Sequence, residues 1–323
     1  MKALILTKDG PAFEEREPPK PRPSEVLVRV HAAALNRVDL AMVQGHVHGG
    51  AGGLDQVLGV EWAGEVVETG AQAGHFKSGD RVMGSGAGAF AQFAVADVGR
   101  VLPIPDANLS FGAAATLPVA LQTLHDALVT NGGLIAGQSV LIHGASSGVG
   151  LMGLQIAKAR GANLVIGSST TLERRSRLVE FGADLAVDSS DRAWVEQVLE
   201  ATGGAGVDLV VDQVSGPRFN DTMRATRIGG RIVNVGRLGA DRGDFNFDLH
   251  ALRRLTYVGV TFRTRSKEEV REITRKLIVD LWPDLEAGRL RLPIDRVFAF
   301  DEILAALSHM RANQHFGKIV IAL

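Results

Sequence analysis

The sequence has no cysteine and only one tyrosine, Tyr257, among its 323 residues. Without cysteine it can form no disulfide, no thiolate nucleophile and no cysteine-ligated zinc or iron–sulfur centre.

An excess of charge of one sign and a long apolar run are also missing. Lys and Arg number 35 against 36 Asp and Glu, so no overall field favours nucleic acid or an anionic membrane. The opening stretch MKALILTKDGPAF is too short in apolar residues for a signal peptide, and no segment has the roughly 18 apolar residues of a membrane span. We expect a cytoplasmic protein with a small-molecule substrate, and no nucleic-acid or membrane partner.

The length and composition indicate a folded protein of two domains. A chain of 323 residues exceeds the size at which single cores usually stop growing, and it is 46% hydrophobic and 22% charged. To about residue 117 the pattern is one of short strands separated by glycine, proline and charged residues: KALILT, EVLVRVHAAAL, AGEVVETG, GDRVMG and AQFAVAD. This pattern predicts a mostly β domain.

Apolar strand-like runs then alternate with helical stretches at a steady spacing. They are SVLIHG, NLVIGS, LAVDSS, VDLVVDQV, GRIVNVG and TYVGVTF, beginning near residues 139, 163, 185, 207, 230 and 256. That spacing accommodates a strand, a crossover helix and two loops, so it predicts a doubly wound parallel sheet. Two helices, over 266–288 and 301–313, and a closing strand over 317–323 are expected to return to the first domain.

A glycine-rich loop joins the first of these strands to a helix. Small residues there let the backbone approach a pyrophosphate, and the helix N-terminus offers free N–H groups. The same glycines would also suit a tight turn of purely structural value. The residues proposed to bind the phosphates are Gly144, Ser146, Ser147, Gly148, Val149 and Gly150.

The end of the second strand favours NADPH over NADH. Ser168 and Ser169 stand where a carboxylate would bind both ribose hydroxyls of NADH, and Arg174, Arg175 and Arg177 follow in the next helix. Guanidinium groups there suit a 2′-phosphate. Alternatively, these arginines only solvate a helix face.

Read together, these segments and the motifs ALNRVDL, GVEWAGEVVETG, FKSGDRVMG, AATLPVALQTLHDAL and HFGKIVIAL resemble the medium-chain dehydrogenase/reductase superfamily, specifically its zinc-free quinone oxidoreductase branch. The resemblance implies an α/β fold of two domains. Residues 1–118 and 264–323 would form a GroES-like, mostly β catalytic domain. Residues 119–263 would form a Rossmann domain that binds NADP(H).

The resemblance also implies that no zinc is bound. Zinc-dependent relatives have Cys, His and Cys ligands, and the corresponding positions here are Asn36, Val60 and about Val119. Glu61 remains, but one carboxylate does not make a zinc site. We therefore expect hydride transfer to quinones or α,β-unsaturated carbonyl compounds, whose unsaturation accepts hydride without a metal.

Catalytic roles follow from the same resemblance for Asn36, Glu61 and Thr123. Asn36 would donate its amide N–H to the substrate oxygen, and Thr123 would contact and orient the nicotinamide. The alternative for Thr123 is an ordinary β-branched helix residue. Ala41 stands where relatives often carry a tyrosine, so the proton donor is unassigned.

Further cofactor positions come from segments beside the nicotinamide in the family. Of these, Arg237 and Arg263 would touch phosphate or substrate, or would be solvated loop charges. Two departures, Ser147 in place of a frequent glycine and Ser189 in place of a tyrosine near the 2′-phosphate, affect details of the cofactor pose. The further positions are Val214, Val235, Gly236, Arg237, Phe262, Arg263 and Lys318.

The segment QGHVHGGAGG, residues 44–53, places His46 and His48 in a glycine-rich loop. With no cysteine available, a bound metal is the least favoured interpretation. The loop is either a solvated connection or a cover of the substrate pocket, with Trp62 assigned to the same substrate region. In the second case, either histidine would be able to supply the proton.

These expectations describe an NADPH-dependent quinone or enone reductase that needs no zinc. The alternatives are an enoyl-thioester reductase acting on a CoA-linked or carrier-linked substrate, and a catalytically idle NADPH-binding protein with a sensing role. The strand TYVGVTF is expected at the edge of its sheet, where pairing with a second copy would make a homodimer.

Overall fold

The structure is a computed structural model that describes residues 1–105 and 108–323. It divides into two compact units. Unit 1 comprises Met1–Val119, Phe262–Glu286 and Arg291–Leu323, and unit 2 comprises Ala120–Thr261 and Ala287–Leu290. Over the described ranges, every helix is too short or too polar to cross a bilayer.

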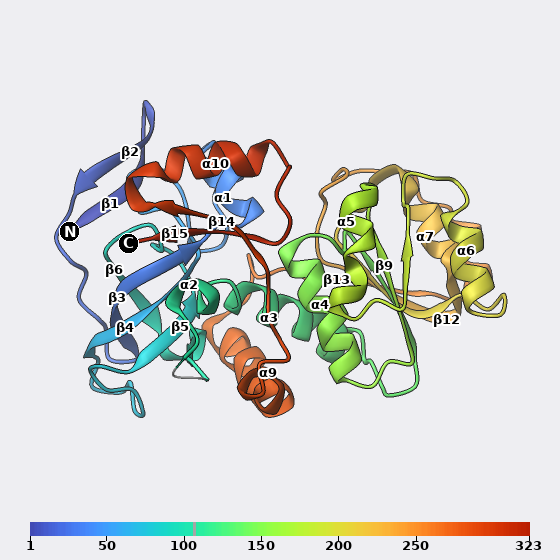
Figure 1. The fold of residues 1–323 in the computed structure, drawn as a ribbon, viewed down its shortest axis with the longest axis horizontal. Coiled ribbons are helices and arrows are strands. Elements are labelled where there is room, and N and C mark those ends of the chain that lie inside the picture. Colours follow the sequence, from blue (N-terminus) through green and yellow to red (C-terminus); the bar gives the residue numbers. More distant parts are fainter. Residues whose placement is uncertain (106–107) are drawn as a thin grey trace. The chain divides into compact units, whose positions relative to one another are not determined.

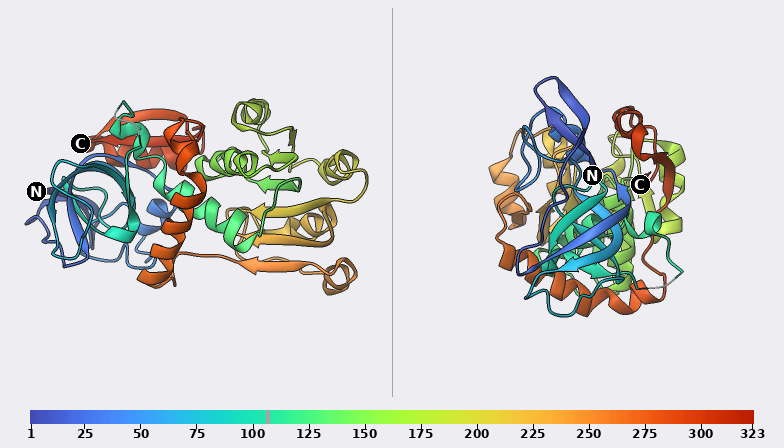
Figure 2. Two further views of the ribbon diagram at one scale, coloured as in Figure 1. Left: turned by 90° about the horizontal axis from the view of Figure 1, so that it is seen from below. Right: turned by 90° about the vertical axis from the view of Figure 1, so that its left-hand side faces the viewer.

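Unit 1 is a strongly curved sheet with a short hairpin beside it (Figures 1 and 2). The seven-stranded sheet has the order β14-β15-β3-β4-β5-β7, with β6 also paired to β3, and β1 pairs with β2. Its strands are β1 (Lys2–Thr7), β2 (Gly10–Glu15), β3 (Glu25–Ala34), β4 (Glu61–Thr69), β5 (Arg81–Ser85), β6 (Phe93–Asp97), β7 (Val101–Pro103), β14 (Ile294–Ala299) and β15 (Lys318–Ala322). Its helices are α1 (Arg37–Met42), η1 (Val98–Arg100), α2 (Phe111–Ala114), α9 (Lys267–Glu286), η5 (Phe300–Glu302) and α10 (Ile303–Arg311).

The last strand of the chain pairs with an early one, and this pairing builds the polar site of unit 1. β15 runs antiparallel to β3, with Val320 opposite Ala34. Just beyond this register the Leu35 N–H donates to Ile319 O at 2.9 Å. Residues about 280 positions apart in sequence, Asn36 and Lys318, are therefore brought together.

Unit 2 contains the predicted doubly wound sheet, which is confirmed. Its six strands all run parallel in the order β10-β9-β8-β11-β12-β13. The order reverses between β8 and β11, and ligands of such sheets bind at the carboxyl ends of the strands at this point. The strands are β8 (Ser139–His143), β9 (Leu164–Ser168), β10 (Leu185–Val187), β11 (Val207–Asp212), β12 (Thr226–Asn234) and β13 (Thr256–Gly259).

Helices cover both faces of this sheet because alternate strand residues are apolar on each side. Leu141 packs with Trp194 and Met223 of α6 and α7, whereas Ile142 points to Gly153 of α4. Figure 1 shows α4 and α5 on one side of β9 and α6 and α7 on the other. The helices that lie in unit 2 or extend into it are α3 (Pro118–His125), the π-helix η2 (Asp126–Asn131), α4 (Gly148–Ala159), α5 (Leu172–Ser176), η3 (Leu178–Phe181), α6 (Trp194–Ala201), η4 (Gly216–Arg218), α7 (Phe219–Ala225) and α8 (Phe247–Arg253).

Candidate functional site

The glycine-rich loop of unit 2 turns sharply from β8 into α4. Gly144 has a φ of +71°, a left-handed conformation that favours glycine. Ser147 caps α4, because its Oγ accepts a hydrogen bond from the Gly150 N–H at 3.0 Å and donates one to Gly144 O at 2.9 Å. The loop is therefore held by its own side chain in one conformation.

The geometry of this loop fits a dinucleotide diphosphate. The backbone N–H groups of Gly148 and Val149, at the positive end of a 12-residue helix, have no hydrogen-bond acceptor within the described residues. A Cβ added at Gly150 would lie 2.5 Å from Gly144 O, so only glycine allows the helix to approach the loop this closely. Free donors beside a small-residue surface are what a bound diphosphate requires.

The two serines at the end of β9 differ in their surroundings. The Ser168 hydroxyl is completely buried and lies 2.9 Å from His143 Nδ1, so it is engaged inside unit 2 rather than turned to a ligand. Burial lowers the pKa of His143, with the Asp212 charge opposing it, and the ring is neutral in this network. The Ser169 Oγ instead donates to Ser146 Oγ at 3.1 Å, which links the strand end to the phosphate loop.

The arginines after β9 also separate into two kinds. Arg175 is committed to the protein, since it donates to Asp188 Oδ2 at 2.8 Å and to Ser169 O at 3.0 Å. Hydrogen bonds from Ser190, together with Arg175, lower the pKa of Asp188, so this carboxylate stays ionised. Arg174 is half-buried on the short helix α5, which follows this strand end. Its contact with the 2′-phosphate stays a prediction.

Gln213 connects the carboxyl ends of β8 and β11, a role that the sequence did not reveal. Its Nε2 donates to His143 O at 3.0 Å, and its Oε1 lies 3.3 Å from Ser147 Oγ, whose single proton it shares with Gly144 O. The following loops also join, because the Gly239 N–H donates to Val214 O at 2.8 Å and the Val235 N–H to Asp212 O at 2.8 Å. The predicted positions after β11 and β12, including Gly236 and Arg237, thus belong to one bonded rim with the phosphate loop.

A buried polar network in unit 1 joins Asn36, Glu61 and Lys318. Lys318 Nζ contacts Glu61 Oε2 at 2.6 Å and Asn36 Oδ1 at 3.0 Å, and Asn36 Nδ2 donates to Glu61 Oε2 at 2.9 Å. Glu61 Oε1 accepts from the Val119 N–H at 2.7 Å. Because Glu61 is completely buried and both its oxygens are used, it positions its neighbours rather than touching a ligand.

This network changes the interpretation of Lys318 and refines that of Asn36. Lys318 is only 4% exposed and its ammonium is directed to Glu61 and Asn36, so its predicted contact with the cofactor stays a prediction. The Asn36 amide also donates to Ala34 O, at the longer distance of 3.3 Å. This weaker bond identifies the N–H that a substrate oxygen would compete for.

Asp39 completes the network and was not singled out from the sequence. Its Oδ2 accepts from the Asn36 backbone N–H at 2.7 Å, and its Oδ1 is buried with no hydrogen-bond partner among the described residues. Burial raises the pKa of Asp39 to about 7, with the hydrogen bond from Asn36 and the charge of Lys318 opposing the shift. The carboxyl is therefore part protonated near neutral pH. Within the described chain, no three His, Asp or Glu side chains gather into a possible metal site.

The histidine loop packs against a second predicted segment of unit 1. A Cβ added at Gly49 would lie 3.5 Å from Arg263 O and 3.7 Å from Phe262 O, so residues 262–263 lie beside the loop. Burial, and secondarily the charge of Arg263, lowers the pKa of His48, whereas the exposed His46 places Nδ1 3.1 Å from Ala41 O. The two imidazoles therefore differ in environment.

Two other predicted residues lie apart from this loop. Trp62 belongs to β4 and is completely buried in the core of unit 1, so its assignment to a substrate-facing region is wrong in this structure. The Trp62 ring fills the space over Gly84, where an added Cβ would come within 2.7 Å of it. Thr123 lies on α3 in unit 2, where it is partly exposed.

Comparison with known proteins identifies the family. The family model of the alcohol dehydrogenase GroES-like domain matches residues 22–106, and that of the zinc-binding dehydrogenase matches residues 148–279. A solved structure of a probable oxidoreductase from Mycobacterium abscessus is 30% identical, with a TM-score of 0.85 over 100% of this chain and 99% of the other. This chain belongs to the medium-chain dehydrogenase/reductase superfamily. The predicted family and fold class are confirmed.

Curated relatives of this superfamily member differ in size and in name. The quinone oxidoreductase of Homo sapiens is 27% identical, over 94% of this chain and 91% of its own length. The low-reducing polyketide synthase drtA of Aspergillus calidoustus is 31% identical, over 95% of this chain. The chain spans only 13% of the length of that polyketide synthase.

Proposed function

We propose that this medium-chain dehydrogenase/reductase is an oxidoreductase that uses NADPH to reduce quinones or α,β-unsaturated carbonyl compounds without a metal. One observation carries the proposal: the loop over 144–150 presents unpartnered N–H groups at the head of a doubly wound sheet. Relatives named as quinone oxidoreductases support the acceptor class, because they match along nearly their whole length.

The cofactor would be held by unit 2. The N–H groups of Gly148 and Val149 would bind the diphosphate, and Arg174 would bind the 2′-phosphate that distinguishes NADPH from NADH. The rim residues Val214, Val235, Gly236 and Arg237, together with Thr123 on α3, would orient the nicotinamide ring. When bound, the nicotinamide supplies the hydride for the reaction.

Asn36 is our proposed donor to the substrate oxygen. An enone or quinone that accepts hydride develops negative charge on its oxygen, and a fixed N–H donor stabilises that charge. Lys318 and Glu61 hold the two ends of the Asn36 amide, so the direction of its N–H groups is set before any substrate arrives. Preorganisation of this kind lowers the barrier because no donor must be reoriented during the reaction.

The environments of the two loop histidines favour His46 as a proton source. With its pKa lowered by burial, His48 is neutral at pH 7 and is a poor acid. His46 is exposed, so its ring is accessible to solvent and protons. We expect His46→Ala to lower kcat and alter its pH profile, with His48→Ala as the matched control. Unchanged kinetics in both variants would make the loop only a cover and water the proton source.

Stopped-flow measurement of NADPH oxidation tests the function directly. The acceptors are quinones, short enones, enoyl-CoA esters and aldehydes, each repeated with NADH. We expect the fastest oxidation with NADPH and a quinone or short enone. If NADPH binds yet no acceptor is reduced, the protein is a cofactor-binding sensor and the enzyme proposal is wrong.

Arg174→Glu tests the choice of cofactor. Because a carboxylate would repel the 2′-phosphate, we expect the KM for NADPH to rise by about tenfold or more while that for NADH changes little. Arg311→Glu, an exposed arginine on α10 of unit 1, is the control for a general change in charge. Equal effects of Arg174→Glu on both cofactors would remove Arg174 from the site.

An enoyl-thioester reductase is the second candidate. The identity to a segment of a polyketide synthase, 31%, exceeds the 27% to the human quinone oxidoreductase. The same hydride chemistry would then act on a CoA-linked or carrier-linked enone. In the acceptor panel this candidate predicts that enoyl-CoA esters have a kcat/KM far above that of free enones.

A further inference from the structure

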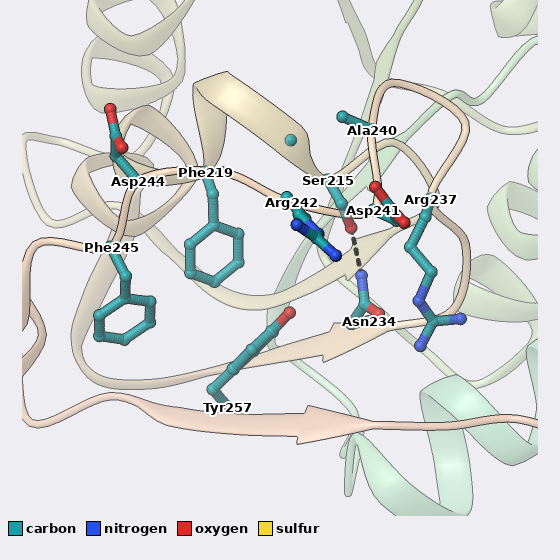
Figure 3. Close-up of a pocket in the computed structure, with 12 residues that line it drawn as sticks. Ser215, Phe219, Asn234, Arg237, Ala240, Asp241, Arg242, Asp244, Phe245 and Tyr257 are labelled. Atoms are coloured by element: carbon teal, nitrogen blue, oxygen red, sulfur yellow. Dashed lines mark hydrogen bonds between the residues drawn. The ribbon is translucent and has the colours of Figure 1, made fainter.

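Unit 2 contains a pocket that the proposed reaction does not use. It has a volume of about 150 Å³ and lies at the carboxyl ends of β12 and β13, under the loop over 237–245 (Figure 3). Three segments line it: the turn that begins α7, with Ser215 and Phe219; the strand residues Asn234 and Tyr257; and the loop itself. Arg237 is the one lining residue that the proposed cofactor site also includes.

One wall of the pocket is aromatic. The Phe219 ring centroid lies 4.7 Å from that of Tyr257 and 5.7 Å from that of Phe245. Figure 3 shows the three side chains grouped at one end of the pocket. Tyr257 keeps 44% of its surface exposed, so part of its ring is available to a planar apolar group.

The other wall carries two exposed arginines, Arg237 and Arg242. Within the described part of the chain, neither makes a hydrogen bond or an ion pair with a protein group. In Figure 3 both guanidinium groups are turned toward the side where Asn234 and the Tyr257 hydroxyl lie. Burial and Asp212 raise the pKa of Tyr257, against the charge of Arg237, so its hydroxyl stays protonated and can donate. In Figure 3 the Arg242 guanidinium and the Tyr257 hydroxyl lie on the same side of Asn234, where an anionic group would be bound.

The charge of the lining limits the charge of the ligand. Asp241 and Asp244 lie on the same loop as Arg242, so two carboxylates offset the two guanidinium groups. A dianionic phosphate would be repelled by these carboxylates more strongly than a singly charged carboxylate. The balance therefore disfavours a dianion relative to a monoanion.

The backbone beside the pocket is strained. Ser215 has φ 57° and ψ −156°, a conformation that non-glycine residues rarely adopt. The Asp212 carboxylate holds it, because Oδ1 accepts from the Ser215 N–H at 2.9 Å, and Ser215 Oγ donates to Gly236 O at 2.9 Å. Residues held in such conformations cluster at ligand sites.

We propose that this pocket binds a small aromatic carboxylate, with Arg242 and the Tyr257 hydroxyl on the carboxylate and the Phe219, Phe245 and Tyr257 rings against the aromatic group. The site is separate from the proposed reaction and does not depend on it. Binding here would restrain the loop over 237–245, whose first residues belong to the rim after β12.

Titration calorimetry with benzoate tests the site in the full-length protein. We expect saturable binding that weakens about tenfold or more in Arg242→Gln and several-fold in Tyr257→Phe, since each variant removes a donor to a charged group. Arg311→Gln is the matched control and should bind benzoate as the unmodified protein does. Tyr257→Phe keeps the ring, so it tests the hydroxyl even if Arg242→Gln does not fold.

Three results would overturn this site. The first is benzoate affinity that is unchanged in both variants. The second is tighter binding of inorganic phosphate or phenyl phosphate than of benzoate. The third is complete exclusion of benzoate by saturating NADPH, which would make the pocket part of the cofactor site. Because the readout is benzoate binding, failure here leaves the proposed oxidoreductase activity untouched, and loss of that activity leaves benzoate binding intact.

Discussion

At the scale of single residues, the buried ion pair of Glu61 and Lys318 has the clearest energetic meaning. Their exposed fractions are 0% and 4%, so neither charge is solvated by bulk water. Desolvation makes a buried pair a weak source of stability, but removing one partner leaves an uncompensated charge. The pair is therefore best understood as a device that orients the Asn36 amide.

Lys318→Met should destabilise the protein by about 3–5 kcal/mol, because Glu61 would remain buried without its charge partner. Adding Glu61→Gln should recover much of this loss. Lys158→Met removes a partner from the more exposed Lys158–Asp184 pair and should cost about 1 kcal/mol or less. Urea denaturation measures all three, and similar losses for Lys158 and Lys318 would contradict the special cost of the buried pair.

The pKa of Asp39 predicts how stability depends on pH. Because burial raises this pKa from 3.8 to about 7, the folded state binds a proton that the unfolded state has released across that interval. The stabilising contribution of Asp39 to the free energy of unfolding is therefore full below about pH 4 and is lost as the pH rises toward 7.

We expect the stability of Asp39→Asn, measured relative to the unmodified protein, to increase by about 2–3 kcal/mol as the pH is raised from 5 to 8. The side-chain amide oxygen of the new asparagine can still accept the hydrogen bond from the Asn36 backbone N–H, so this contact at the start of α1 is kept. Because His48 and His143 titrate in both proteins, only the difference between them reports on Asp39. Urea denaturation at the two pH values gives that difference, and parallel pH profiles would show that Asp39 does not titrate in this range.

At the scale of elements, the first turn of α4 couples stability to the proposed cofactor binding. The Ser147 cap holds both the helix N-terminus and the Gly144 turn. Ser110 caps α2 in the same way, since its Oγ accepts from the Ala113 N–H at 3.2 Å. The two caps therefore allow a controlled comparison.

Ser147→Ala and Ser110→Ala should each cost about 1 kcal/mol of stability. Only Ser147→Ala should also weaken NADPH binding, by several-fold, because its loop would lose the conformation that presents the free N–H groups. Thermal unfolding with and without NADPH separates the two effects. An equal stabilisation by NADPH in both variants would mean that the cap does not position the cofactor.

Two strands of unit 1 that were not predicted lack an apolar pattern. β14 is mostly exposed along its length, and β2 has no fully buried residue, so neither shows the alternation that marks a half-buried strand. The exposed helix α8 is similar, with no buried residue. By contrast, the six parallel strands begin within four residues of their predicted starts, because a sheet covered on both faces needs continuous apolar runs.

At the scale of the whole molecule, β13 is an edge strand that suits pairing with a second copy. Among the described residues β13 pairs with β12 alone, and Phe247 and Leu252 of α8, the helix that precedes it in the chain, are exposed. An uncovered edge beside an apolar surface is a common route to a two-fold dimer. A homodimer remains our proposal.

Gly259→Lys tests this dimer in solution. A Cβ at Gly259 meets no atom within 4 Å, so the substitution fits the isolated chain but places a charge on the strand edge. We expect sedimentation to give a dimer for the unmodified protein and for Gly259→Ala, and a monomer for Gly259→Lys. A dimer in all three would place the interface elsewhere, and a monomer in all three would remove the dimer.

The sequence by itself determined the parallel sheet and the position of the phosphate loop, because both depend on local apolar periodicity and on glycines at fixed spacing. The family followed from the resemblance of its motifs along the whole chain. Only the tertiary structure decided what the polar residues do. It placed Lys318 on Glu61 and Asn36, buried Ser168 and Trp62, and revealed Gln213 and Asp39 as partners of the predicted residues. Such roles depend on contacts between residues far apart in the chain, and on the loss of water around them, which no local pattern encodes.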